Sequence, residues 1–142
     1  MIVMRVAFGT DTSNTTTSAV VAHIRGMGHV VEVVADPAPW PDVGRKVGEM
    51  VAAHHAELGV VCCWTGTGVS MAANKVTGVR AALCHSAEIA TGARKWNDAN
   101  VLALGVASLS VSDATVVVDA FFDPDIEVDA DEADNIATVT DA

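Results

Sequence analysis

Residues 58–75, LGVVCCWTGTGVSMAANK, constrain the fold of this chain more than any other stretch. An apolar run over residues 58–64 leads into the glycine-rich segment TGTG, and the sequence from Val69 onward suits a helix. This succession is typical of a buried strand, a tight turn and the start of a helix. Such a turn points backbone N–H groups and the positive end of the helix dipole at the space beyond the strand. We therefore predict that an anionic or electron-rich ligand binds there, beside Cys63.

Strands and helices are expected to alternate along the remainder of the chain. Short runs rich in β-branched and apolar residues predict strands at 1–9, 30–34, 58–64, 79–84 and 100–104. Helical spacing and capping residues predict helices at 19–27, 43–55, 69–75, 86–96 and 112–122, and three prolines predict a loop at 36–41. The alternation indicates the α/β class, with a parallel sheet covered by helices on both faces.

The acidic side chains concentrate at one end of the chain. The 142 residues include 18 acidic and eight basic side chains, for a net charge of −10, and many of the acids follow Phe122. We therefore divide the chain into one domain, residues 1–122, and an acidic tail, residues 123–142, which is either flexible or packed on a partner subunit. The charge argues against binding to nucleic acid or to an anionic membrane, since both require a basic surface.

The three cysteines, Cys62, Cys63 and Cys84, argue against a disulfide framework, because their number is odd and two of them are adjacent. No Cys/His spacing suggests zinc, so we expect neither a metal nor a cofactor. The start of the chain, MIVMRVAFG, lacks the pattern of a signal peptide, and no apolar run is long enough to span a bilayer. These features predict a cytoplasmic protein with reduced thiols.

Ligands of parallel α/β sheets bind beyond the carboxyl ends of the strands. This rule places the predicted site at Asp11, Thr12, residues 63–68, His85 and the residues around Asn97. The segment TGTG matches neither the P-loop nor the GxGxxG pattern, so a nucleotide site is not supported. Consecutive N–H groups in a glycine turn are nevertheless suited to stabilising an enediolate.

Two of these residues have a structural and a functional interpretation. Cys63 is either a general base, whose thiolate is stabilised by the helix N-terminus, or a small core residue. The alternation of side chains along a strand puts Cys62 on the opposite face, in the core. Asp11 is either the N-cap of the following helix or a ligand of a substrate hydroxyl. A turn alone would explain Asn97 and Asp98.

Four segments together resemble the ribose-5-phosphate isomerase B / galactose-6-phosphate isomerase family. They are VAFGTD at 6–11, CWTGTGVSMAANKVTGVRAALC at 63–84, ARKWNDANVLALG at 93–105 and VVDAF at 117–121. The resemblance implies a three-layer α/β/α Rossmann-like fold with a five-stranded parallel sheet. It also implies a homodimer or tetramer with active sites at subunit interfaces, and a metal-independent interconversion of aldose and ketose through a cis-enediolate.

The resemblance also implies a role for individual residues. The family's base cysteine falls on Cys63, and the hydroxyl that assists proton movement between oxygens falls on Thr65. The amides that hold the enediolate fall on the glycine turn. The complete set implied to bind substrate is Asp11, Thr12, Trp64, Gly66, Thr67, Gly68, Ser70 and Asn97.

The chain departs from the family pattern at several of these positions. Thr12 and Trp96 stand where the family has histidines, the second of which opens the sugar ring. Ala107 aligns with the first phosphate-holding arginine, and no Lys or Arg follows Lys95 to replace the other two. Trp64 takes the place of a glycine after the base cysteine and is suited to stacking on a sugar face.

The sequence therefore leaves three hypotheses. In the first, the chain is an aldose–ketose isomerase for a small sugar or sugar phosphate, and ring opening falls to His85, to Asp98 or to solution chemistry. In the second, it is a non-catalytic family member that serves as a sugar-binding module or as the partner in a hetero-oligomer. In the third, it is a cysteine-dependent redox or acyl-transfer enzyme, which would require His85 to reach Cys63.

Overall fold

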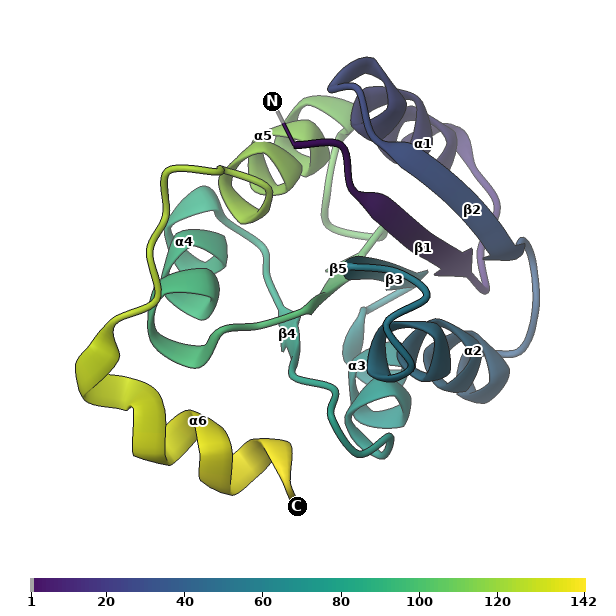
Figure 1. The fold of residues 1–142 in the computed structure, drawn as a ribbon. Helices are drawn as coiled ribbons and strands as arrows, with labels where there is room; N and C mark the ends of the chain where they lie inside the picture. Colours follow the sequence, from purple (N-terminus) through teal and green to yellow (C-terminus); the bar gives the residue numbers. More distant parts are fainter. Residues whose placement is uncertain (1) are drawn as a thin grey trace.

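The computed structural model describes residues 2–142 and contains one sheet of five parallel strands between two layers of helices (Figure 1). In the order in which they lie side by side, the strands are β2 (Val30–Ala35), β1 (Arg5–Thr10), β3 (Leu58–Cys63), β5 (Val101–Gly105) and β4 (Ala81–Leu83). The predicted three-layer α/β/α Rossmann-like fold is thereby confirmed. The direction of strand progression reverses between β1 and β3, so the crevice at their carboxyl ends is the expected ligand site.

The helices occupy both faces of this sheet. Their bounds are α1 (Thr15–Gly26), α2 (Trp40–Ala52), α3 (Thr67–Asn74), α4 (Ala87–Asn97), α5 (Val111–Phe121) and α6 (Ala133–Thr140), with a 3-10 turn, η1 (Ala130–Glu132), before the last. Helices α1, α4 and α5 cover one face, and α2 and α3 pack together on the other (Figure 1). Among residues 2–142, no helix combines the length and the apolar character needed to cross a bilayer.

The sheet separates two apolar cores. Phe8, Leu102 and Phe121 belong to the core under α1, α4 and α5, whereas Val47 and Val61 belong to the core under α2 and α3. The central strand β3 is buried along its whole length, as expected for a parallel strand covered on both sides. The cores fix β3, and with it the start of the turn that follows.

The second helix begins earlier than predicted. We expected a loop at 36–41 because of its prolines, but Trp40 already starts α2, with Pro39 as its N-cap. Pro41 lies in the first turn, where a backbone N–H has no helical partner and its loss costs nothing. The helix also ends at Ala52 rather than at residue 55, because His54 adopts a φ of 59°.

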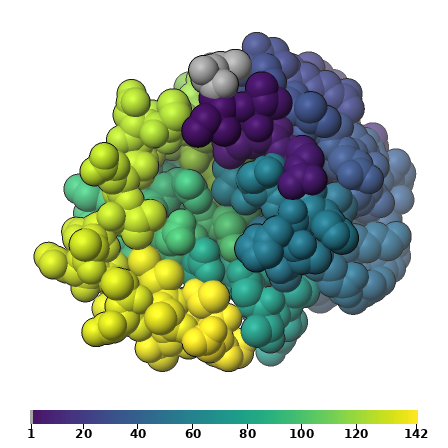
Figure 2. Space-filling view, viewed as in Figure 1, coloured from purple at the N-terminus to yellow at the C-terminus, as the bar shows by residue number. Residues whose placement is uncertain are grey.

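The fourth strand is shorter than predicted, and the acidic tail contains helical structure. Only residues 81–83 of the expected strand 79–84 pair with β5. In the tail, η1 and α6 form a helical segment that the sequence pattern did not indicate, and the backbone N–H of Gly78 donates to Thr140 O at 3.2 Å. Figure 2 shows the tail, in yellow, against green and teal surface. A contact between the tail and a partner subunit stays a prediction.

Candidate active site

The turn after β3 requires glycine at its centre. Gly66 is the N-cap of α3 and has a φ of 79°, a left-handed conformation that costs glycine little and other residues about 1–2 kcal/mol. A Cβ atom at this position would lie 2.5 Å from Leu83 Cδ1 and 2.8 Å from Gly105 N. Conformation and space both exclude a side chain, so the backbone of the turn passes directly over the ends of β4 and β5.

Cys63 is held against this turn. Its Sγ accepts a hydrogen bond from the backbone N–H of Gly66 at 3.2 Å, and its side chain is 5% exposed. Cys62 faces the other core, as the alternation predicted. Burial, with smaller contributions from the charges of Cys63 and Asp11, raises the pKa of the Cys62 thiol far above its usual range. Of these two neighbours, only Cys63 lies beside the N-terminus of a helix.

Hydroxyl and aromatic side chains lie along the turn. The Oγ1 atoms of Thr65 and Thr67 are 2.8 Å apart and exposed, so these hydroxyls exchange a hydrogen bond at the start of α3. Trp64 is 60% exposed. The ring of Trp40 covers Gly68 so closely that a Cβ there would lie 2.9 Å from Trp40 Cδ2. Two indoles therefore flank the turn, one from β3's end and one from α2.

Asp11 extends the edge of the site along β1. Its backbone N–H donates to Cys62 O at 3.1 Å, and its Oδ1 accepts from Thr12 Oγ1 at 2.8 Å. Its interpretation as a helix cap is wrong, because Asn14 forms a capping box with Thr17 and caps α1 instead. The Asp11 carboxylate is thus left at the crevice between β1 and β3, beside the carboxyl end of the strand that carries Cys63.

His85 also lies at the carboxyl edge of the sheet. It follows Cys84 and is exposed, while Ser86 caps α4 by accepting a hydrogen bond from Ile89 N at 3.2 Å. Cys84 belongs to the core under α1, α4 and α5, and burial raises the pKa of its thiol to about 11. Ser70, in the first turn of α3, is half-buried.

Asn97 and Asp98 lie at the opposite edge. Helix α4 starts at the carboxyl edge and returns, so Asn97 ends near the amino end of β5. Val101 pairs with Gly59 and Gly105 with Cys63, so about 13 Å of strand separates the two edges at 3.3 Å per residue. One chain alone therefore does not bring Asn97 to Cys63, and the expected place of Asn97 at the carboxyl edge is wrong. Asp98 lies 3.3 Å from Arg80 and 3.9 Å from Arg94 and forms ion pairs with both.

The carboxyl edge has little positive charge of its own. Its connecting segments, 11–14, 36–39, 64–66, 84–86 and 106–110, contain Asp11 and Asp36 but neither Lys nor Arg. The eight basic residues lie elsewhere and are Arg5, Arg25, Arg45, Lys46, Lys75, Arg80, Arg94 and Lys95. Among residues 2–142, no three His, Cys, Asp or Glu side chains are grouped so that they would hold a metal ion.

The sequence did not single out Trp40 as part of this region, and it gave Arg80 no role in the turn after α4. Trp40 was hidden in the predicted loop, although an indole between two prolines at a strand end is a recognisable surface for a ligand or a helix. Arg80 precedes a short strand in an otherwise apolar segment, and its side chain is only 15% exposed. A buried arginine needs partners, which is a usable signal, but the sequence does not identify them.

Comparison with known proteins relates this chain to sugar isomerases. Residues 6–139 match the family described as Ribose/Galactose Isomerase. The chain is 35% identical over 125 residues to ribose-5-phosphate isomerase B of Escherichia coli, and the match covers 82% of each protein. It is 38% identical over 84 residues to galactose-6-phosphate isomerase subunit LacB of Clostridium acetobutylicum, but this match spans 59% of the chain and about half, 49%, of the relative.

Solved structures show the same architecture. Ribose-5-phosphate isomerase B of Clostridium thermocellum superposes with a TM-score of 0.90 at 31% identity, over 96% of this chain and 95% of that one. The likeness therefore extends over nearly the whole chain and is not confined to the turn that carries Cys63.

Proposed function

The chain belongs to the ribose/galactose isomerase family, and on that premise we propose that it is a metal-independent aldose–ketose isomerase acting on a small sugar or sugar phosphate. The observation that carries this proposal is the hydrogen bond from Gly66 N–H to Cys63 Sγ, which holds the thiol against the glycine turn beside the topological switch point. A base and an oxyanion cradle in one turn are what proton transfer next to a carbonyl requires.

In the proposed reaction, the Cys63 thiolate removes the proton from C2 of the open-chain aldose. The electrons of that bond form the C1–C2 double bond, and the negative charge moves onto the former carbonyl oxygen. Amides of residues 66–68 stabilise the resulting cis-enediolate. Thr65, whose hydroxyl lies at the start of α3, moves a proton between the two oxygens. Cys63 then returns its proton to C1, which gives the ketose and regenerates the thiolate.

We propose that the active enzyme is a homodimer, either alone or paired into a tetramer, with sites at the subunit interface. Asn97 supports this proposal, since it lies at the edge of the sheet opposite Cys63 and would serve the site of the neighbouring subunit. Exposed apolar side chains around α3, Trp64 and Met71, at 60% and 64%, offer surface that a second copy would cover. The buried, free cysteines suit a reducing, cytoplasmic location.

If the substrate is a sugar phosphate, the connecting segments at the carboxyl edge of the same chain supply neither Lys nor Arg to bind its phosphate. Backbone N–H groups at the start of α3 and groups of the second subunit are then its partners. Both free and phosphorylated aldoses belong in the test for this reason. His85 is the exposed candidate for ring opening at this edge, because Asp98 is engaged by Arg80.

Solvent-deuterium exchange at C2 tests the assignment. Tetroses, pentoses and their phosphates are incubated with the protein in D2O, and exchange is followed by NMR. Cys63→Ala should lower the exchange rate by about 100- to 10,000-fold, the usual worth of a general base. Cys62→Ala is the matched control, because it removes the neighbouring thiol from the opposite face and should keep the exchange rate within a few-fold.

Exchange that is as fast in Cys63→Ala as in the wild type would refute the assigned base. The alternative function, a sugar-binding module or the partner in a hetero-oligomer, is favoured by Trp96, which is 51% exposed where the ring-opening histidine is expected. Binding of an aldose without any exchange at C2 would select that alternative.

A further inference from the structure

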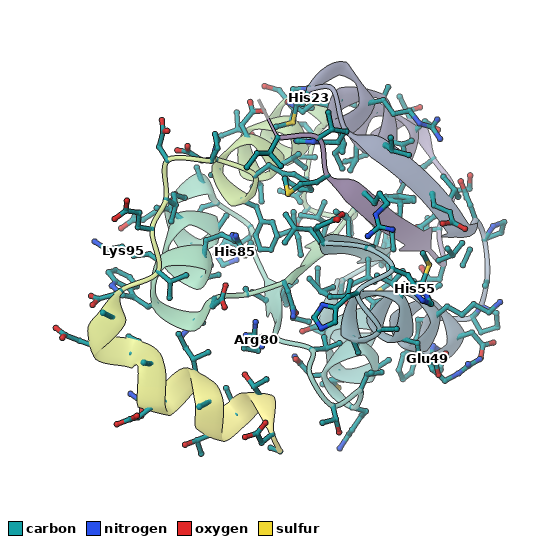
Figure 3. All side chains as sticks on the ribbon, viewed as in Figure 1. His23, Glu49, His55, Arg80, His85 and Lys95 are labelled. Atoms are coloured by element: carbon teal, nitrogen blue, oxygen red, sulfur yellow. The ribbon has the colours of Figure 1, made fainter. Side chains whose placement is uncertain are left out.

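Arg80 connects three segments that are distant in the sequence. Its Nε donates to Asp98 O at 2.8 Å and its second amino group to Asp98 Oδ2 at 3.3 Å, while the first donates to Thr140 Oγ1 at 2.9 Å. Its backbone N–H donates to Asn100 Oδ1 at 2.8 Å. Figure 3 shows Arg80 between the start of β4 and α6. The arginine thus ties the C-terminal helix to the turn between α4 and β5.

The turn that Arg80 holds has an unfavourable backbone conformation. Asp98, the C-cap that follows α4, has φ and ψ of 46°, in the left-handed region. A non-glycine residue keeps such a conformation when its surroundings fix it. Arg94 contributes as well, since its guanidinium donates to Ala99 O. Two arginines therefore determine the path of the chain immediately after Asn97.

Asn97 and Arg80 also line one cavity. The cavity has a volume of about 440 Å³ and lies at the amino edge of the sheet. Asn74, at the end of α3, and Val139, in α6, also line it. Three of the five guanidinium N–H groups of Arg80 are engaged by the chain itself, and Asp98 neutralises its charge. The geometry favours a role in holding the turn over a role in binding an anion.

We propose that Arg80 is a positioning residue of the isomerase site. It fixes the Asp98 turn so that Asn97 is presented from the end of α4 to the substrate, and it makes that presentation depend on α6 through Thr140. This inference rests on the proposed function, because Asn97 matters only if it binds substrate.

A double-mutant cycle tests whether Arg80 acts through Asn97. In the wild-type background, Arg80→Gln should lower kcat/KM by about 10- to 100-fold, the cost of a small misplacement of a binding group. In the Asn97→Ala background the same change should cost less than about twofold, because the group that it positions is gone. Arg25→Gln is the matched control: Arg25 also donates to a backbone carbonyl, Val31 O at 3.1 Å, but far from Asn97.

Equal losses in the two backgrounds would overturn the proposal, and so would a loss confined to phosphorylated substrates, which would make Arg80 an anion ligand. Arg80→Lys covers the case in which Arg80→Gln does not fold. Lysine keeps the positive charge but not the three guanidinium hydrogen bonds to Asp98 and Thr140, so Arg80→Lys should be less active than the wild type. Its loss of kcat/KM should also be smaller in the Asn97→Ala background.

A measurement without substrate separates this proposal from the proposed function. Amide hydrogen exchange over residues 97–100 should accelerate in Arg80→Gln and, to a smaller extent, in Thr140→Val, and should stay unchanged in Arg25→Gln. Unchanged exchange there would overturn the positioning role whatever the activity. Accelerated exchange in a protein that isomerises no aldose would leave the structural link standing and refute the function.

Discussion

Replacing Gly66 by alanine is the sharpest test of the turn that carries Cys63. The left-handed backbone at Gly66 costs alanine about 1–2 kcal/mol. Its Cβ would lie 2.8 Å from Gly105 N and 2.9 Å from Leu104 C, backbone atoms that cannot rotate away, and overpacking of this kind costs about 1–3 kcal/mol. We therefore expect the free energy of unfolding to fall by about 2–5 kcal/mol, a large share of the roughly 5–15 kcal/mol of a typical domain.

Urea unfolding followed by tryptophan fluorescence measures this loss. Gly26→Ala is the control, because a Cβ at Gly26, the last residue of α1, has no neighbour within 4 Å. That change should leave stability unaltered or raise it by up to about 1 kcal/mol. A Gly66→Ala protein within about 0.5 kcal/mol of the wild type would show that the turn relaxes freely, and the argument from close approach would be refuted.

Two further outcomes follow from the buried thiols and from a helix cap. Alkylation with iodoacetamide at pH 8, mapped by mass spectrometry, should modify Cys63 before Cys62 or Cys84, because burial raises the pKa of both of those thiols. With a pKa of about 11, roughly one Cys84 side chain in a thousand is a thiolate at pH 8. Earlier labelling of Cys84 would contradict this order. Ser86→Ala should lower the free energy of unfolding, measured in urea, by about 1 kcal/mol, because the hydrogen bond from Ile89 N–H to the Ser86 hydroxyl is lost. Ser86→Asp keeps a capping oxygen and should have nearly the stability of the wild type.

Local patterns were sufficient for much of the fold. The alternation of apolar strands and capped helices predicted a parallel sheet covered on both faces, and the structure confirms it. The prediction failed at Trp40, and the sequence pattern did not indicate the helix in the tail, because a short segment has no periodic pattern of its own. Trp40 is helical because Pro41 lies within the first turn, and α6 is tied down through Thr140.

The candidate site divides in the same way. Cys63, the glycine turn and Asp11 follow strands directly, so the rule for the carboxyl ends of parallel strands was enough to group them. Asn97 was expected at the same edge, and the family resemblance implied a substrate contact for it, but its distance from Cys63 depends on which way α4 runs across the sheet. The roles assigned to these residues stay predictions that the exchange experiments test.

By itself, the sequence determined the α/β class, the glycine at position 66 and the thiol beside it, because these depend on neighbours within a few residues. The tertiary structure decided the strand order, the separation of Asn97 from Cys63 and the contacts of Arg80 with Asp98 and Thr140. The physical reason is that a hydrogen bond between residues 80 and 140 leaves no periodic trace in either segment. Only the packed sheet and helices bring its donor and its acceptor together.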